Sequence, residues 1–270
     1  LLYPKEKIYN VWISGSKDVG INKLNFIRLF DSTSSHNIQN LQRDFIANAS
    51  HELKTPVSVI IGYCETLLND KKATTKVKEK FLKTMAKEAT RMSSLVNDLL
   101  SLTRIERMEH SPPSEKVDLG RILQEVEQIC IDRNLFNKIK CKFVVSKKKY
   151  EILGDPPELK QVFLNIIENA VTHSNSKKAV VVKLGSVKSL INFSVEDFGI
   201  GIPNENIPLL TKRFYRVDEA RSRNSGNTGL GLSIVKHIVN RHNAELSINS
   251  IEGKGTKFSI IFNKDKPSLL

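Results

Sequence analysis

One short segment, Asn48–Pro56, brings together a histidine, a carboxylate and a hydroxyl group. Imidazole is neutral and nucleophilic near physiological pH, so His51 could accept a phosphoryl group if a neighbour removed or held its second proton. Glu52 supplies a carboxylate for that role. Pro56 removes a helical hydrogen bond and is expected to bend the helix one turn after His51. A lone histidine on a helix is more often an ordinary surface residue, so the interpretation depends on the whole segment.

A second group of polar residues lies on another predicted helix. Asn165 and Asn169 are four residues apart and therefore share one helix face. Neutral amide oxygens suit a magnesium ion that already binds triphosphate oxygens, because further carboxylates would repel the nucleotide. Taken alone, the pair is weak evidence, because two such asparagines are more often ordinary core or surface residues.

Two glycine-rich segments follow. Asp197 comes directly after a predicted strand, and Gly199 and Gly201 would let the backbone approach a flat ring while the carboxylate accepts from its amino group. The segment Gly226–Leu232 leads into a predicted helix, whose free N–H groups form an anion site suited to phosphates. It lacks the GxxxxGK[ST] pattern of a P-loop. Each glycine segment alone also fits an ordinary turn.

The histidine lies in the first of two predicted long helices. Apolar residues recur at steps of three and four from Ile38 to Leu67 and again from Phe81 to Leu102, with a polar turn at Asn69–Thr75. Two amphipathic helices joined by a short turn form an antiparallel hairpin with an uncovered apolar stripe. Pairing with a second copy as a four-helix bundle would cover it, so the pattern predicts a homodimer.

Beyond a linker at Glu109–Ser114, helices and strands alternate. Helices are predicted from the Asp118 cap to Arg133, from Asp155 and Pro156 to about His173, and from Leu230 to Arg241. Strands are predicted near 140–146, 179–186, 190–196, 244–250 and 256–262, with a polar stretch at 203–228. This mixture, with apparent hairpins, favours a two-layer α/β sandwich over a doubly wound sheet.

The histidine segment resembles the phosphoacceptor box of sensor histidine kinases, F-x-A-x-x-S-H-E-L-K-T-P. Phe45, Ala47 and Ser50–Pro56 match it. The resemblance implies that His51 is the phosphoacceptor and Glu52 its acid–base partner. It also implies that Thr55 helps to position water when the phosphate of a partner protein is removed.

The remaining segments resemble, in order and rough spacing, the Bergerat (GHKL) ATP-binding fold, and within it the histidine kinase branch. Phe214–Arg216 matches the phenylalanine box of the nucleotide lid, and Gly253–Phe258 the last glycine box. The resemblance implies that Asn169 binds Mg²⁺ directly and that Asp197 recognises adenine. The implied ATP site comprises Asn165, Asn169, Asp197, Gly199, Gly201, Phe214, Tyr215, Arg216, Thr228, Gly229, Leu230 and Gly231.

Two details of the implied site stay open. Arg216, Arg221 and Arg223 are alternatives for the side chain that reaches the terminal phosphate. Many family members carry lysine where this chain has Thr172 and tyrosine where it has His173, which puts one phosphate contact in question.

The resulting prediction is an α+β chain in which a helical hairpin, dimerising as a four-helix bundle, precedes a two-layer α/β sandwich of Bergerat type. The expected domains are a remnant at 1–33 that resembles the last strands of a PAS-type sensor domain, the phosphotransfer helices at 34–110, a linker at 111–116 and an ATP-binding domain at 117–265.

The expected activity is autophosphorylation of His51 from Mg²⁺-ATP, followed by transfer to an aspartate of a response-regulator receiver and dephosphorylation of that regulator. A GHKL ATPase that works as a mechanical clamp would need no phosphoacceptor, so the complete His51 box disfavours it. A scaffold that binds nucleotide without turnover is disfavoured by the intact Asp197 and Asn169.

The composition bounds the partners and the compartment. Lys and Arg number 42 against 29 Asp and Glu, a formal charge of +13, but the lysines are scattered and no nucleic-acid motif accompanies them, so we expect no direct nucleic-acid binding. Three cysteines without CxxC spacing indicate thiols in the reducing cytoplasm. No apolar run approaches the roughly 18 residues of a membrane span. Because the chain begins Leu-Leu, we expect a piece of a longer protein anchored in the inner (plasma) membrane.

Overall fold

A computed structural model of the chain describes residues 7–19, 22–69, 74–109, 111–137, 139–146, 148–174, 176–217 and 228–264. The chain divides into two compact units, residues 1–85 and 86–270. Each unit is described by itself.

The first unit begins with a two-stranded antiparallel ribbon of β1 (Tyr9–Val19) and β2 (Asn22–Asp31). Gly15 lies within the first strand, at a shift in register between Ser14 and Lys17 that forms an irregularity in the ribbon. Large apolar side chains of the ribbon, including Trp12, are exposed.

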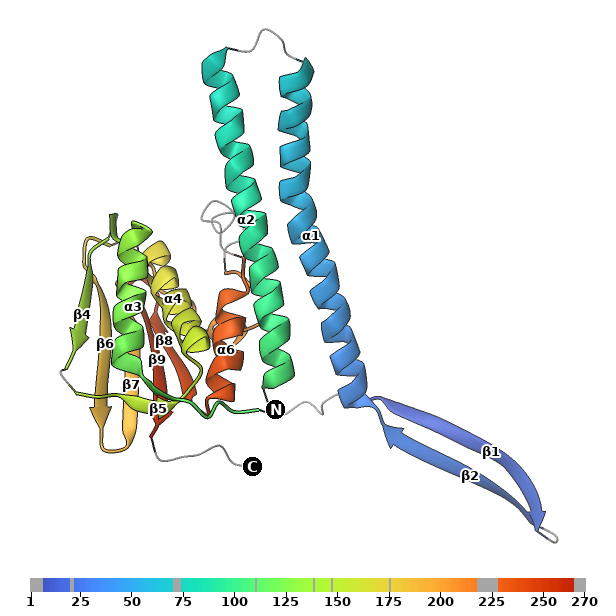
Figure 1. Cartoon of the computed structure of the whole chain (residues 1–270). Helices are drawn as coiled ribbons and strands as arrows, with labels where there is room; N and C mark the ends of the chain where they lie inside the picture. Colours follow the sequence, from blue (N-terminus) through green and yellow to red (C-terminus); the bar gives the residue numbers. More distant parts are fainter. Residues whose placement is uncertain are drawn as a thin grey trace. The chain divides into compact units, whose positions relative to one another are not determined.

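Two long helices follow, α1 (Thr33–Asn69) and α2 (Thr75–Met108), close to the predicted helical hairpin (Figure 1). Near the turn between them the rings of Tyr63 and Phe81 pack with centroids 4.7 Å apart. Helix α1 continues through Pro56, which is its one buried side chain among the described residues. Among the described residues no helix has the length and apolar content needed to cross a membrane.

The second unit, from residue 86 onward, contains the end of α2 and a two-layer sandwich. Its five-stranded sheet has the order β4-β6-β7-β9-β8, in which β4 and β6 are parallel and the other neighbours antiparallel. Helices α3, α4 and α6 cover one face of this sheet (Figure 1). The strands are β4 (Cys141–Val145), β6 (Val180–Val187), β7 (Leu190–Glu196), β8 (Glu245–Ile251) and β9 (Gly255–Asn263).

The three helices begin and end close to the predicted residues. They are α3 (Leu119–Asp132), α4 (Pro156–His173) and α6 (Gly231–Arg241). The Asp118 side chain accepts from Gly120 N and that of Asp155 from Glu158 N, so both predicted caps are confirmed. A short pair of strands that the sequence did not reveal, β3 (Lys116–Asp118) and β5 (Glu151–Leu153), joins the starts of these two helices.

The core lies between the helices and the sheet. Alternate residues of β7, namely Ile191, Phe193 and Val195, are fully buried, so this face of the strand points towards the helices. The ring of Phe193 stacks on that of Phe163 of α4, with centroids 4.1 Å apart. This packing fixes α4 against the central strand β7. The polar residues of α4 and those at the end of β7 are therefore held in fixed positions as well.

Candidate functional site

Asp197 follows the last residue of β7 and continues its buried, helix-facing side. Its side chain is 5% exposed, and its Oδ1 accepts from the backbone N–H of Gly199 at 2.8 Å. Burial raises the pKa of this carboxyl, against the opposing hydrogen bonds from Gly199 and Thr256. A buried carboxylate with a fixed orientation can accept a hydrogen bond from the amino group of a planar base.

Glycines around Asp197 allow three backbone segments to meet. A Cβ at Gly199 would lie 2.5 Å from the carbonyl oxygen of His173, so the end of α4 packs directly on this loop. Gly201 has a φ of +68°, and a Cβ there would lie 2.2 Å from the Ile251 carbonyl oxygen. Larger residues would push the loop after β7 away from both neighbours.

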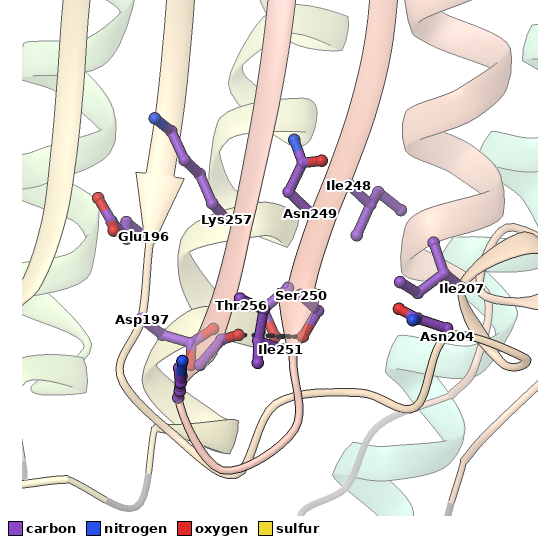
Figure 2. A pocket seen from close by; sticks show the side chains of 12 residues that line it. Glu196, Asp197, Asn204, Ile207, Ile248, Asn249, Ser250, Ile251, Thr256 and Lys257 are labelled. Carbon is purple, nitrogen blue, oxygen red and sulfur yellow. Dashed lines mark hydrogen bonds between the residues drawn. The ribbon is translucent and has the colours of Figure 1, made fainter.

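The far side of Asp197 is formed by β8 and β9. Figure 2 shows a hollow of about 390 Å³ where Asp197, Thr256 and Ser250 meet, with the two hydroxyl oxygens 2.9 Å apart. Neither Asn165 nor Gly231 lines this hollow, so it is not the whole site that the motifs define.

Asn165 links α4 to the start of α6. Its Nδ2 donates to the carbonyl oxygen of Gly231 at 3.2 Å, which places the amide beside the helix N-terminus. Asn169, one turn further along α4, is half-buried, and its amide makes no hydrogen bond to any other described residue. Neutral oxygens in this position fit Mg²⁺, which keeps several water and phosphate ligands and needs few from the protein.

The start of α6 is held by local hydrogen bonds. Thr228 Oγ1 accepts from Leu230 N at 3.2 Å and donates to Asp98 Oδ2 of α2 at 2.7 Å. Gly229 has a φ of +76°, and its carbonyl oxygen accepts from Phe214 N at 3.0 Å. Phe214, inside the predicted lid at 203–228, is therefore joined to Gly229, next to helical N–H groups that can bind an anion.

The phenylalanine box lies within the predicted lid at 203–228. Tyr215 Oη donates to Asn206 Oδ1 at 2.9 Å, and Arg216 is half-buried. Arg221, Arg223, Gly226 and Asn227 lie outside the described residues, so the choice of the arginine that reaches a phosphate stays a prediction.

Three residues near the site received no role from the sequence. Ser174, directly after α4 and beside Gly199, is 2% exposed and its hydroxyl has no hydrogen-bond partner among the described residues. Thr256 belongs to the matched glycine box and lies against Asp197. Asp98 had no signal beyond its place on a helix, because its contact with Thr228 joins residues far apart in sequence.

The phosphoacceptor segment lies on α1, in the first unit. His51 and Thr55 are exposed and Glu52 is half-buried, as expected for a ring at the solvent edge of a helix. Thr55 Oγ1 donates to the His51 carbonyl oxygen at 3.2 Å. The imidazole is therefore available at the surface of the helix.

Comparisons with known proteins agree with both parts. A family model described as histidine kinase-, DNA gyrase B- and HSP90-like ATPase matches residues 154–266, and the His kinase A phospho-acceptor domain matches residues 41–107. The fold and site thus define a GHKL-type ATPase domain coupled to a phosphoacceptor helix pair. The chain thus carries the two domains of the sensor histidine kinase family, the phosphoacceptor domain and the GHKL-type ATPase domain.

Two curated relatives carry the same class of name. The phosphate regulon sensor protein PhoR of Pseudomonas aeruginosa is 35% identical over 245 residues, which are 89% of this chain and 54% of PhoR. The sensor protein kinase WalK of Staphylococcus aureus is 35% identical over 236 residues, 86% of this chain and 56% of WalK. The chain thus spans about half the length of these relatives.

A solved structure supports the fold. The histidine kinase AdeS of Acinetobacter baumannii superposes with a TM-score of 0.63 at 23% identity, over 80% of this chain and 98% of AdeS. At this identity the likeness shows the fold alone. The predicted α+β class, with a helical pair followed by a sandwich of Bergerat type, is confirmed.

Proposed function

We propose that this chain transfers the γ-phosphoryl group of ATP to His51 and passes it to a response regulator. The observation that carries the proposal is the placement of α4. Asn165 meets the start of α6, and the end of α4 at His173 packs on the loop after Asp197. These two points are eight residues apart, or about 12 Å along a helix at 1.5 Å per residue, a span suited to a nucleotide with its base at one end and its phosphates at the other.

In this proposal each motif serves one part of the nucleotide. The Asp197 carboxylate accepts from the adenine amino group, and the glycines beside it admit the flat ring. The N–H groups at Gly229 and Gly231 bind phosphate oxygens at the positive end of α6. Asn169 and Asn165 would hold Mg²⁺, which supplies neutralisation of the triphosphate charge.

The transfer itself requires an exposed imidazole with a lone pair. One ring nitrogen of His51 attacks the γ-phosphorus in line, the bond from that phosphorus to the leaving oxygen breaks, and ADP departs with the electron pair. Glu52 removes or holds the proton of the other ring nitrogen. An arginine from the lid, Arg216, Arg221 or Arg223, stabilises the charge on the transferred group.

The second step delivers the group to a partner protein. An aspartate of a receiver domain attacks phosphohistidine, forming an acyl phosphate and restoring the His51 ring. Thr55 lies one helical turn from His51 and donates to its carbonyl oxygen. In this proposal it orients the water that hydrolyses the acyl phosphate of the regulator, a separate reaction from the transfer. The two relatives, both named as sensor proteins, support a role of this kind.

The assembly and location are part of the same proposal. The helix pair dimerises as a four-helix bundle, supported by exposed apolar residues of α1 such as Leu41 and Ile61. Residues 1–33 end a PAS-like sensor domain, 111–116 are the linker, and 117–265 bind ATP. The chain is the cytoplasmic part of a membrane-anchored sensor, and it binds no nucleic acid directly.

The test is labelling with γ-³²P-ATP and magnesium. The wild-type chain should gain an acid-labile, base-stable label, and His51→Gln should abolish it while leaving nucleotide binding unchanged. His36→Gln is the matched control, because His36 is also exposed on α1. Label that persists in His51→Gln, or no label at all with bound ATP, would contradict the proposal and favour a nucleotide-binding scaffold or a clamp-type ATPase.

A further inference from the structure

The last turn of α6 makes a group of contacts that nucleotide binding does not explain. His237, Asn240 and Arg241 are spaced three and four residues apart and so share one side of the helix. All three contact residues 108–111, where α2 ends and the linker begins. We call these three side chains the linker clamp.

Arg241 is the centre of the clamp. Its side chain is 5% exposed, and its Nε donates to two backbone carbonyl oxygens, that of Met108 at 3.1 Å and that of Ser111 at 2.9 Å. Met108 is the last residue of α2, so the guanidinium also lies at the negative end of that helix dipole. One buried cation thereby holds both sides of the turn that leaves α2.

The opposite side of the guanidinium is anchored in the sandwich. Arg241 Nη1 lies 2.5 Å from Glu158 Oε2 and 3.7 Å from Asp155 Oδ2, both at the start of α4. Glu158 is 3% exposed, which is rare for a carboxylate without a charged partner. The arginine therefore joins the first turn of α4 to the linker through α6.

The other two clamp residues bind the first side chain of the linker. His237 Nδ1 lies 2.9 Å from Glu109 Oε2, and Asn240 Nδ2 donates to Glu109 Oε1 at 3.1 Å. Both carboxylate oxygens of Glu109 are therefore engaged by α6. Glu106, one turn earlier on α2, pairs with Arg213 at the base of the lid.

Helix α6 thus has different tasks at its two ends. Its N-terminus carries the phosphate-binding glycines, and its C-terminal turn holds the linker, about 15 Å away for a helix of this length. We infer that Arg241 is a positioning residue, which fixes the pivot about which the ATP-binding domain delivers its phosphoryl group to His51. The inference builds on the proposed kinase function and adds a residue that touches neither nucleotide nor histidine.

The test compares Arg241→Lys with Arg133→Lys in the full chain. Lysine keeps the charge next to Glu158 but has no second nitrogen to donate to the Met108 and Ser111 carbonyl oxygens, as Nε of arginine does while Nη1 faces Glu158. Arg133 pairs with Glu168 at the surface, 3.1 Å apart, and so serves as a matched control. The expected result is a fall on the order of tenfold in kcat for His51 labelling, with the KM for ATP unchanged, because misplacing reacting groups slows transfer without weakening binding.

Hydrogen exchange supplies a readout that does not depend on labelling. The amide of Ser111, which donates to Met108 O at 2.8 Å, should exchange faster in Arg241→Lys while the amides of β7 stay protected. Equal exchange at residues 109–115 and an unchanged kcat would overturn the inference. If the wild-type chain itself gains no label, the proposed function fails, and the exchange comparison alone decides whether the clamp exists.

A second variant covers the case in which Arg241→Lys unfolds. Glu109→Gln weakens the hold of His237 and Asn240 on the linker and leaves the buried pair of Arg241 and Glu158 in place. It should lower kcat in the same direction by a smaller factor, with unchanged ATP binding. An equal loss of ATP binding and of kcat in both variants would mean that the clamp merely supports the fold, and would overturn the inference.

Discussion

The helix that bears His51 and the helix that bears the asparagines are built by different rules. Of the described side chains of α1, Pro56 alone is buried, whereas α4 buries seven, from Glu158 to Ala170. The groups proposed to hold ATP are therefore fixed by tertiary packing, and the proposed acceptor is displayed on an open helix. An acceptor that must meet a nucleotide domain and then a receiver domain has to stay uncovered, so the difference matches the two tasks.

The difference predicts that shortening a side chain to alanine destabilises the two regions unequally. This contrast in unfolding free energy is the largest effect that we expect. Phe193→Ala should destabilise the ATP-binding domain by about 3–5 kcal/mol, because it leaves a cavity against Phe163. Leu68→Ala on α1, a position 76% exposed, should change the unfolding free energy by less than about 0.5 kcal/mol. Urea unfolding of both variants measures the two changes in unfolding free energy. Changes of similar size would contradict the proposed difference between the two regions.

A second prediction separates binding from stability at Asp197. Asp197→Asn should weaken ATP binding by about 1.5–3 kcal/mol, the usual contribution of a hydrogen bond to a charged group. The pKa of Asp197 is raised by burial, so its ionised form costs stability at pH values above that pKa, and the apo variant should be at least as stable as wild type at pH 7.

Glu245→Gln is the control for this prediction, since Glu245 is exposed at the start of β8 and does not line the hollow beside Asp197. Calorimetric titration with ATP and thermal unfolding of the apo protein give the two quantities. A variant that loses stability and ATP binding together would show that Asp197 has a structural role instead.

The packed region should also respond to pH through His242. Burial lowers the pKa of this imidazole below its ordinary value of 6.5; its Nδ1 lies 2.8 Å from the Ile238 carbonyl oxygen and its Nε2 accepts from Asp155 N. The unfolded chain takes up the proton first, so stability is full above pH 6.5 and declines as pH falls towards the folded pKa. The slope is at most about 1.4 kcal/mol per pH unit.

His242→Gln should remove this slope, because glutamine does not titrate. The unfolding free energies of variant and wild type are compared between pH 7 and 5. Carboxyl groups titrate in both proteins, so the difference between the two profiles is the contribution of His242. Parallel pH profiles would show that His242 is not the group responsible.

The smallest effect is expected in the helix pair. Tyr63 and Phe81 pack near the turn, and a double-mutant cycle with alanine should give a coupling of about 0.5–1.5 kcal/mol. The same cycle with Ile61 in place of Tyr63 is the control. Ile61 is 51% exposed and should not couple to Phe81. A coupling near zero would mean that the ring contact does not help to hold the two helices.

The sequence predicted the helices and main strands well, because period, caps and glycines are local signals. Asp118 and Asp155 capped the helices as expected, and the motif residues Asn165 and Gly231 meet. The β3–β5 pair was missed because three-residue strands carry no period. The clamp at Arg241 and the Asp98–Thr228 contact were missed because they join residues more than a hundred positions apart, for which one sequence holds no signal.

The hydrogen bond from Phe214 to Gly229 has a consequence for how such a domain can change over time. This bond joins the two residues that flank the segment 215–228. The positions of Phe214 and Gly229 relative to each other therefore do not depend on the length of that segment. Lengthening a tethered loop costs little, about 0.6 kcal/mol for each doubling. We therefore expect that a lid at this position can gain, lose or exchange residues, and so change the rate or selectivity of the domain, while the site residues on α4 and α6 stay unchanged.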